Sequence, residues 1–541
     1  MYCGVHYFMD ITTDWIRDNL IGANSSIETP FGTRRLTYAD YIASGRALEF
    51  VENTLRHNVL PFYANTHTED SLTGGRTTHF AHEAGDYIKA QLNASEYKIA
   101  FCGSGSTSAI KRIQEILGLA APSQLKARLL EVMRPEERTV VFVGPYEHHS
   151  NEVSWRESLA EVVEIPLCPK GLIDLDALRD ALKDPKYKGR PKIGSFSAAS
   201  NVTGLISDTR SIARLLHAQG AYAFFDFAAS APYVKIDMRP NLPDGYDAVF
   251  ISPHKMIGGI GSPGILVFNP SLYNLATPST AGGGTVTYVS SSDHDFTPDI
   301  EAREDAGTPA ILQKMRAALG FWVKAQIGTD KIEKLEKHYI KTAIARLRQH
   351  PNLEILGNLE MPRLAVLSFL VKSGSSYLHP RFVVKLLNDL FGIQSRGGCA
   401  CAGPYGHRLL DIDTATSEAY RASVGAGFEG IKPGWTRLNF NYFIDQTEFE
   451  FLLEAIEFIA TFGQRFVTLY DFDWKSGAWK HKQDSSRQVS LFDFIPASLE
   501  TEPANYQAYL EEARKIAASL ENPADREIPV GVPRELVFFR H

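Results

Sequence analysis

The stretch of sequence that decides the fold is Ala248-Val249-Phe250-Ile251-Ser252-Pro253-His254-Lys255. A glycine-rich turn at residues 256–264 and a second apolar run follow it. This order predicts that Lys255 stands at the end of a buried strand. Partial burial disfavours the ammonium form of lysine, so the amine becomes a better nucleophile and could form an imine with an aldehyde. Ser252 and His254 could hydrogen-bond a phosphate on such an aldehyde. The alternative is a lysine that lays its stem along the strand end and keeps its ammonium in water.

A second stretch predicts an anion site. A strand at residues 97–102 runs into a Gly/Ser/Thr turn, and an amphipathic helix at residues 111–117 follows. Free N–H groups at the helix start and the hydroxyls of Ser106 and Thr107 favour a phosphate there. A plain helix N-cap is the alternative. Together with Lys255, this turn indicates pyridoxal 5'-phosphate (PLP), an aldehyde cofactor that carries a phosphate.

Three more polar residues follow predicted strands, at the sheet edge where ligands gather in open α/β folds. His148 could stack on a flat cofactor ring or move a proton, or it could be satisfied by its neighbours. Asn201 could donate to a ring oxygen. Asp226 comes after five apolar residues, where a carboxylate is costly unless paired. A protonated pyridine nitrogen would pair it and keep the ring an electron sink.

The order of phosphate turn, histidine, aspartate and lysine resembles the PLP-dependent fold-type I enzymes, and within them the class V aminotransferase and cysteine desulfurase group. The resemblance runs from about residue 36 to about residue 458. The residues that match are His148 after Glu147 for ring stacking, Asn201 for the ring oxygen, Asp226 for the pyridine, and Ser252, His254 and Lys255 for the phosphate and the imine.

The resemblance implies a fold and an assembly. We expect an α/β large domain with a mixed, mostly parallel sheet covered by helices, and a smaller C-terminal α+β domain. We also expect a homodimer with its active site at the subunit interface. Thr285, in Gly282-Gly283-Gly284-Thr285, would reach the phosphate of the neighbouring subunit. Where the family usually has glutamine, this chain has Ala229, so one contact to the ring oxygen is missing.

A glycine-rich loop near the C-terminal end carries two thiols. Cys399 and Cys401 stand close to Arg396, and such thiols are candidates for nucleophilic attack. The loop resembles the persulfide-forming loop of cysteine desulfurases, and counting from Arg396 places Cys401 at the catalytic position. Cys399 is then an extra thiol of unassigned role. A class V relative that keeps the loop without the sulfur chemistry is the alternative.

Three residues are candidates for binding the substrate. Arg437 lies on a strand-like segment, and its planar fork suits an α-carboxylate, the task of an arginine in this strand of the resembling family. A surface arginine is the alternative. Arg396 beside the thiols is a second candidate. His67 lies in a polar, aromatic loop that could reach the site, although a surface turn explains it as well.

We divide the chain into four parts. They are an N-terminal segment at residues 1–60, the large PLP-binding domain at 61–310, the small domain at 311–465, and an extension at 466–541 with no assigned role.

Composition limits the partners. The net charge of −7 gives no support for nucleic acid or an anionic membrane. We find no uninterrupted apolar run of about 18 residues, and residues 1–6 lack a basic leader, so we expect a cytoplasmic protein without a membrane partner. Five cysteines are too sparse for a disulfide framework, and their spacing predicts no metal site.

The resemblance thus implies a PLP-dependent cysteine desulfurase, with Lys255, His148 and Cys401 as catalytic residues. It would convert L-cysteine to L-alanine and leave a persulfide for an acceptor protein. Two alternatives stay open. One is a class V aminotransferase, lyase or epimerase without thiol chemistry, and the other is an inactive scaffold with the same fold.

Overall fold

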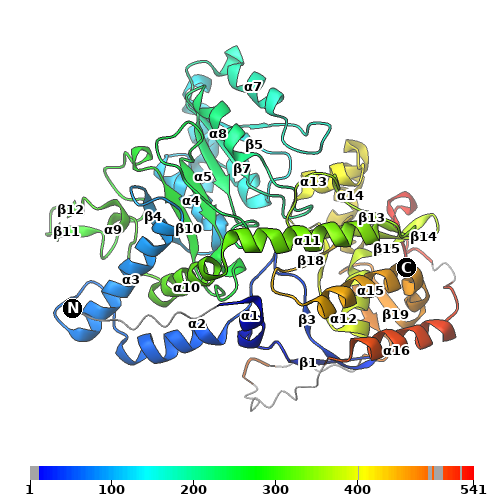
Figure 1. Ribbon diagram of the computed structural model, residues 1–541. Coiled ribbons are helices and arrows are strands. Elements are labelled where there is room, and N and C mark those ends of the chain that lie inside the picture. Colours follow the sequence, from blue (N-terminus) through cyan, green and yellow to red (C-terminus); the bar gives the residue numbers. More distant parts are fainter. Residues whose placement is uncertain (1–10, 400, 485–489, 493–503, 524–526) are drawn as a thin grey trace. The chain divides into compact units, whose positions relative to one another are not determined.

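The computed structural model describes residues 11–399, 401–484, 490–492, 504–523 and 527–541 (Figure 1). These residues group into two compact units. The first contains the described residues up to Ile21 together with Ala43–Ser200 and Ile206–Lys334. The second contains Gly22–Ile42, Asn201–Leu205 and the described residues from Leu335 onward.

A seven-stranded sheet forms the centre of the first unit. In spatial order its strands are β4 (Lys98–Cys102), β10 (Gly264–Phe268), β9 (Ala248–Ile251), β8 (Tyr222–Asp226), β7 (Lys192–Ser197), β5 (Val140–Val143) and β6 (Glu161–Glu164). Strand β10 runs antiparallel to β4 and β9, whereas all pairs from β9 to β6 are parallel. Strands β5, β9 and β10 are buried along their whole length, as expected for a sheet covered on both faces. The predicted mixed, mostly parallel sheet is confirmed.

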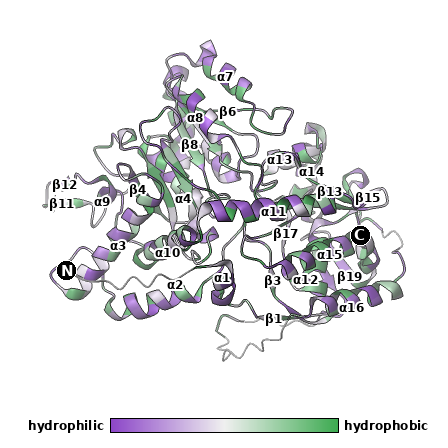
Figure 2. Ribbon diagram, viewed as in Figure 1, coloured by the Kyte–Doolittle hydropathy of each residue, from purple (hydrophilic) through white to green (hydrophobic). Residues whose placement is uncertain are grey.

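Helices α4 (Gly105–Ile116) and α8 (Thr209–His217) pack against strands of this sheet (Figure 1). The other helices of the first unit are α1 (Thr13–Asn19), α2 (Glu49–Thr54), α3 (Leu72–Gln91), α5 (Ser123–Val132), α6 (Val153–Arg156), α7 (Leu175–Lys183), α9 (Ile300–Arg303) and α10 (Ile311–Ile327). Helix α7 is amphipathic, burying Leu178 and Leu182, and in Figure 2 it carries both hydrophilic and hydrophobic colours. A hairpin of β11 (Val286–Val289) and β12 (His294–Phe296) completes the unit.

One helix begins elsewhere than the sequence predicts. Helix α4 starts at Gly105, not at residue 111, so the Gly/Ser/Thr turn itself supplies the first helical turn. Helix α10 packs against α3 in the first unit. The next helix, α11 (Thr329–Leu347), starts in the first unit and ends in the second.

The second unit is an α+β arrangement around a six-stranded sheet. The strands in order are β17 (Arg396–Gly398), β18 (Trp435–Asn439), β14 (Val366–Ser373), β15 (Ser376–Leu378) and β21 (Phe539–Arg540), with β13 (Leu353–Ile355) also paired to β14. Three two-stranded ladders are β1 (Ser26–Thr29) with β2 (Gly32–Arg35), β3 (Thr37–Tyr38) with β16 (Ile393–Gln394), and β19 (Tyr470–Asp473) with β20 (Ala478–His481).

The C-terminal part of the chain supplies one of the helices of the second unit. These helices are α12 (Pro380–Phe391), α13 (Gly403–Leu409), α14 (Thr414–Gly425), α15 (Gln446–Phe462) and α16 (Tyr506–Ser519). Helix α16 packs against α12 and α15, and β21 adds a parallel strand beside β15. The described residues after 466 are therefore part of this unit's fold.

Candidate active site

The ends of two neighbouring parallel strands bring the central candidates of the first unit together. Asp226 is the last residue of β8, and Ser252 directly follows β9. Lys255 closes a short 3₁₀ turn that begins at Pro253. Because β8 and β9 are parallel, these side chains emerge at the same edge of the sheet.

The start of α4 lies against this edge. The Ser106 amide donates to Ser252 Oγ at 2.9 Å, and the two hydroxyl oxygens are 3.0 Å apart. A Cβ atom on Gly105 would lie 2.9 Å from His254 Cε1, and Gly105 has a φ of +56°. Only glycine fits both the space and the backbone there. The structure thus places Ser106, Ser252 and His254 beside one helix N-terminus, an arrangement that suits a phosphate.

Asp226 is a buried acid, 5% exposed. Its Oδ1 accepts a hydrogen bond from the Ala228 amide at 2.8 Å. Burial raises the pKa of Asp226, while this amide, the charge of Lys255 and the Ser106 hydroxyl oppose the rise. A carboxylate in this condition is stabilised by a further cationic partner, and a protonated pyridine nitrogen is one.

Lys255 and His254 are half-buried side by side. Burial, and then the charge of Lys255, lower the pKa of His254 to about 4, so its ring is neutral at neutral pH. The main chain here is tightly packed, because a Cβ on Gly45 would lie 2.0 Å from the Met256 carbonyl oxygen. The Gly45 amide also donates to the His254 carbonyl at 2.9 Å. These contacts fix the backbone from which Lys255 extends.

His148 has a defined tautomer. Its Nδ1 accepts a hydrogen bond from the Ser150 amide at 3.1 Å, so a neutral ring carries its proton on Nε2. The adjacent Glu147 is fully buried and accepts from the Ser197 amide (2.8 Å), the Ser197 hydroxyl (2.6 Å) and Asn151 Nδ2 (2.7 Å). Burial raises the pKa of Glu147 to about 7. This network, which sequence analysis did not find, holds the loop that carries His148.

The remaining candidates of the first unit lie in different surroundings. Thr107 is exposed, and its hydroxyl lies 2.6 Å from Ser150 Oγ. His67 is exposed, with a φ of +67°. Its ring lies against Gly284, because a Cβ atom placed on Gly284 would be 3.1 Å from His67 Cε1. Thr285 is buried and donates from Oγ1 to the Gly282 carbonyl at 2.7 Å. The predicted contact of Thr285 with a neighbouring subunit stays a prediction.

In the second unit, Arg437 on β18 is 3% exposed. Its Nη1 donates to the Asn201 carbonyl at 2.9 Å, and its Nη2 lies 3.0 Å from Asp40 Oδ1. Its buried Nε has no hydrogen-bond partner among the residues that the structure describes. Burial lowers the pKa of Arg437, and Asp40 opposes this. A buried guanidinium with one unused donor fits a carboxylate ligand.

The thiol loop follows β17. Cys399 and Cys401 are both exposed, and Cys401 has a φ of +57°, a left-handed conformation that is uncommon for a residue with a side chain. β17, which leads into this loop, pairs with β18, the strand that carries Arg437. Ala400 lies outside the described residues. Arg396, whose side chain is half-exposed, binds Asp40.

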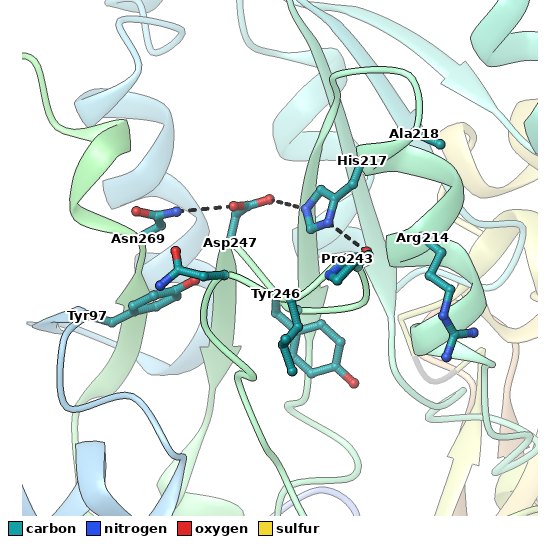
Figure 3. A pocket seen from close by; sticks show the side chains of 11 residues that line it. Tyr97, Arg214, His217, Ala218, Pro243, Tyr246, Asp247 and Asn269 are labelled. Carbon is teal, nitrogen blue, oxygen red and sulfur yellow. Dashed lines mark hydrogen bonds and ion pairs between the residues drawn. The ribbon is translucent and has the colours of Figure 1, made fainter.

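A cavity of about 490 Å³ lies at the opposite edge of the first unit's sheet (Figure 3). Asp247 immediately precedes β9, and Asn269 immediately follows the antiparallel β10. The figure shows Asp247 between His217 and Asn269, with His217 Nε2 at 2.8 Å from Asp247 Oδ2. The cavity is separate from the candidates at the carboxyl edge, and no motif in the sequence indicated it.

In the part of the chain that the structure describes, no group of three or more histidine, cysteine or acidic side chains could hold a metal ion. None of the helices in the described part is long and apolar enough to cross a membrane.

Comparisons with known proteins agree with the architecture. The chain is 27% identical over 391 residues to a probable cysteine desulfurase of Staphylococcus aureus, covering 72% of this chain and 88% of that protein. A cysteine desulfurase structure from Thermococcus onnurineus matches with a TM-score of 0.65 and 22% identity, covering 84% of this chain and 99% of the other. One from Escherichia coli matches with a TM-score of 0.59 and 23% identity, covering 78% and 93%.

These structural matches confirm the predicted fold. The family described as "Aminotransferase class-V" matches residues 37–427, which is most of the chain and includes the strand-end residues and the thiol loop. The resemblance seen in the sequence is thereby confirmed, and the chain belongs to the class V aminotransferase family.

Proposed function

We propose that this chain is a PLP-dependent cysteine desulfurase that converts L-cysteine to L-alanine and collects the sulfur on Cys401. The observation that carries the proposal lies within the second unit: the strand that leads to the exposed thiol pairs with the strand of a buried arginine that has an unused donor. The names of the matched proteins support the same activity.

The first unit would hold the cofactor. Lys255 supplies the amine, Asp226 the partner for the ring nitrogen, and Ser106, Ser252 and His254 the surroundings of the phosphate. Bound PLP would supply an electron sink that labilises bonds at the substrate α-carbon. His148 would stack on its ring. Since a neutral His148 carries its proton on Nε2, that nitrogen is the one that could donate it.

The second unit would act on the substrate. Arg437 binds the α-carboxylate through Nε, and Cys401 attacks the substrate sulfur as a thiolate. A sulfur–sulfur bond forms on Cys401 while the carbon–sulfur bond of the substrate breaks. The electron pair of the broken bond stays on the substrate carbon, which takes up a proton, and alanine leaves. The sulfur remains on the enzyme for an acceptor protein.

The test is to incubate the PLP-loaded protein with L-cysteine and a reductant, and to measure alanine and sulfide. We expect both products from the wild type, and a loss of at least about a hundredfold from Cys401→Ser, because the attacking group is gone. Cys399→Ser is the matched control, since it removes an equally exposed thiol two residues away, and it should keep its activity.

The other outcomes separate the rival functions. Full activity of Cys401→Ser toward an amino acid would favour a class V aminotransferase, lyase or epimerase without thiol chemistry. Failure of the wild type to bind PLP at a lysine would favour an inactive scaffold.

We also infer that the protein acts as a homodimer in the cytoplasm. The exposed Tyr288 and Val289, on the hairpin that follows Thr285, support a covered surface there. Light scattering should give twice the mass of the chain, and Tyr288→Lys should weaken the association.

A further inference from the structure

One buried carboxylate connects the arginine of the proposed substrate site to the strand that leads into the thiol loop. Asp40 is 8% exposed. Its Oδ1 lies 3.0 Å from Arg437 Nη2, and its Oδ2 lies 3.0 Å from Arg396 Nε. All three residues belong to the second unit.

The two arginines need this carboxylate because of the register of their strands. β17 and β18 pair antiparallel with Arg396 directly opposite Arg437. Like charges at directly opposed positions repel each other, and the repulsion is stronger where one of them is buried. Asp40 divides its two oxygens between the two cations, so it compensates both charges at once.

The backbone around Asp40 is held from both sides. β3 pairs with β16, and the Ala39 amide donates to the Gln394 carbonyl at 2.9 Å. The Ala39 carbonyl accepts from the Asn439 amide at 2.9 Å. Asp40 is therefore fixed relative to the strand that carries Arg437 and to the strand that precedes Arg396.

Asp40 also decides which donor of Arg437 is left for a ligand. Nη1 is bound to the Asn201 carbonyl and Nη2 to Asp40, so the plane of the guanidinium is set. Nε is then the buried donor that remains without a partner among the described residues. A carboxylate arriving at Nε meets an arginine that is already oriented, so less ordering entropy is lost on binding.

We propose that Asp40 is a positioning residue that orients Arg437 for the substrate carboxylate and fixes β17, the strand that leads to Cys401. This rests on the proposed function for the tasks of Arg437 and Cys401. Asp40 touches neither substrate nor cofactor in this account, and it acts through the two arginines.

The first experiment separates positioning from stability in the full-length, PLP-loaded protein. Asp40→Asn keeps the size of the side chain and removes its charge. We expect the KM for L-cysteine and the Kd for L-alanine to rise at least about tenfold, as for the loss of one charge-assisted hydrogen bond, with a smaller change in kcat.

Asp389→Asn is the matched control. Asp389 is a fully buried carboxylate of the same unit, bound to Lys385 Nζ at 2.9 Å and to the Tyr470 hydroxyl at 2.8 Å. It lies outside the proposed machinery, so its loss should lower thermal stability and leave KM and Kd unchanged. Equal KM and Kd values in the two variants would overturn the proposal.

The second experiment needs no activity. Hydrogen exchange of the cofactor-free protein should become faster in residues 396–398 in Asp40→Asn but not in Asp389→Asn. Arg396→Gln removes the more exposed partner and should accelerate the same amides, even if Asp40→Asn fails to fold. If the exchange rates of residues 396–398 are unchanged in both Asp40→Asn and Arg396→Gln, Asp40 does not fix β17.

The two proposals fail in different ways. A wild type that produces no alanine from cysteine contradicts the desulfurase function, while the exchange of residues 396–398 still tests Asp40. A wild type that produces alanine, with Asp40→Asn like Asp389→Asn, contradicts only the role of Asp40.

Discussion

Asp226 is a carboxylate that the fold buries before any cofactor is bound. Burial raises its pKa, which means that the folded chain disfavours the charged form. Asp226→Asn should therefore leave the cofactor-free protein as stable as the wild type or more stable. In the loaded enzyme the same change would remove the proposed partner of the ring nitrogen, and activity should fall at least about a hundredfold. Urea unfolding and an alanine assay measure the two effects.

The control for Asp226→Asn is Asp247→Asn in the same unit. Asp247 Oδ2 accepts hydrogen bonds from His217 and from the Ala223 amide, so Asp247→Asn removes the negative charge that faces His217. This variant should lower stability and spare the chemistry. Destabilisation of the cofactor-free protein by Asp226→Asn would contradict the account of Asp226 as a buried carboxylate whose charge is not compensated until a cofactor binds.

The sequence predicted single residues well where a strand end fixed their position. Asp226 ends β8, and Ser252 and Lys255 follow the adjacent parallel strand β9, so apolar runs were enough to place them at one edge. Asp40 could not be found in this way, because its partner Arg437 is 397 residues away in the chain. The hydrogen bonds of Glu147 to Ser197 likewise depend on which strands become neighbours.

At the scale of elements, His217 connects the end of α8 to the start of β9. Its Nε2 faces Asp247 Oδ2 at 2.8 Å, and its Nδ1 faces the Pro243 carbonyl at 3.0 Å. Both partners are acceptors, so the doubly protonated ring satisfies both. The hydrogen bond with Asp247 raises the pKa of His217, against a smaller effect of burial.

This geometry determines whether the contribution of His217 to folding stability rises or falls with pH. The pKa of His217 is higher in the folded chain than in the unfolded chain. Its contribution to folding stability is therefore fully present below the unfolded-state pKa and is lost as pH rises through the folded-state pKa. His217→Gln should cost about 1 kcal/mol of unfolding free energy near pH 6 and less near pH 9. Urea denaturation at both pH values checks this. If His217→Gln lowers the unfolding free energy near pH 9 by as much as near pH 6, or by more, His217 and Asp247 do not form a charged pair.

Element boundaries were predicted less well than element types. The Gly/Ser/Thr run at 103–108 has the composition of a turn, yet α4 begins inside it at Gly105. A contact that the sequence does not show, the hydrogen bond from the Ser106 amide to Ser252 Oγ, stabilises this early start. Tertiary packing therefore overrides the low helix propensity of these residues.

At the scale of the whole molecule, the C-terminal part of the chain builds the core of the second unit. Leu510 on α16 is fully buried, and the Tyr506 ring stacks on Phe451 at 4.0 Å between centroids. Glu512 pairs with Arg34 at 2.6 Å. No role for this part could be predicted from the sequence, because its partners, like those of Asp40, are distant in the chain.

Leu510→Ala should therefore lower the free energy of unfolding by about 2–5 kcal/mol, the range for emptying a buried leucine site. Leu491→Ala is the matched control, because Leu491 is 89% exposed and its loss should change stability by less than about 0.5 kcal/mol. Equal stabilities of the two variants would show that residues 506–519 do not belong to the core.

The central claim is that Lys255 is the amine to which PLP is bound. Borohydride treatment of the PLP-loaded protein reduces the cofactor onto its lysine, and peptide mass spectrometry then locates it. The account predicts one pyridoxyl group per chain, on the peptide that contains Lys255, and none in Lys255→Ala. Labelling of a different lysine, or no labelling of the wild type, would contradict it.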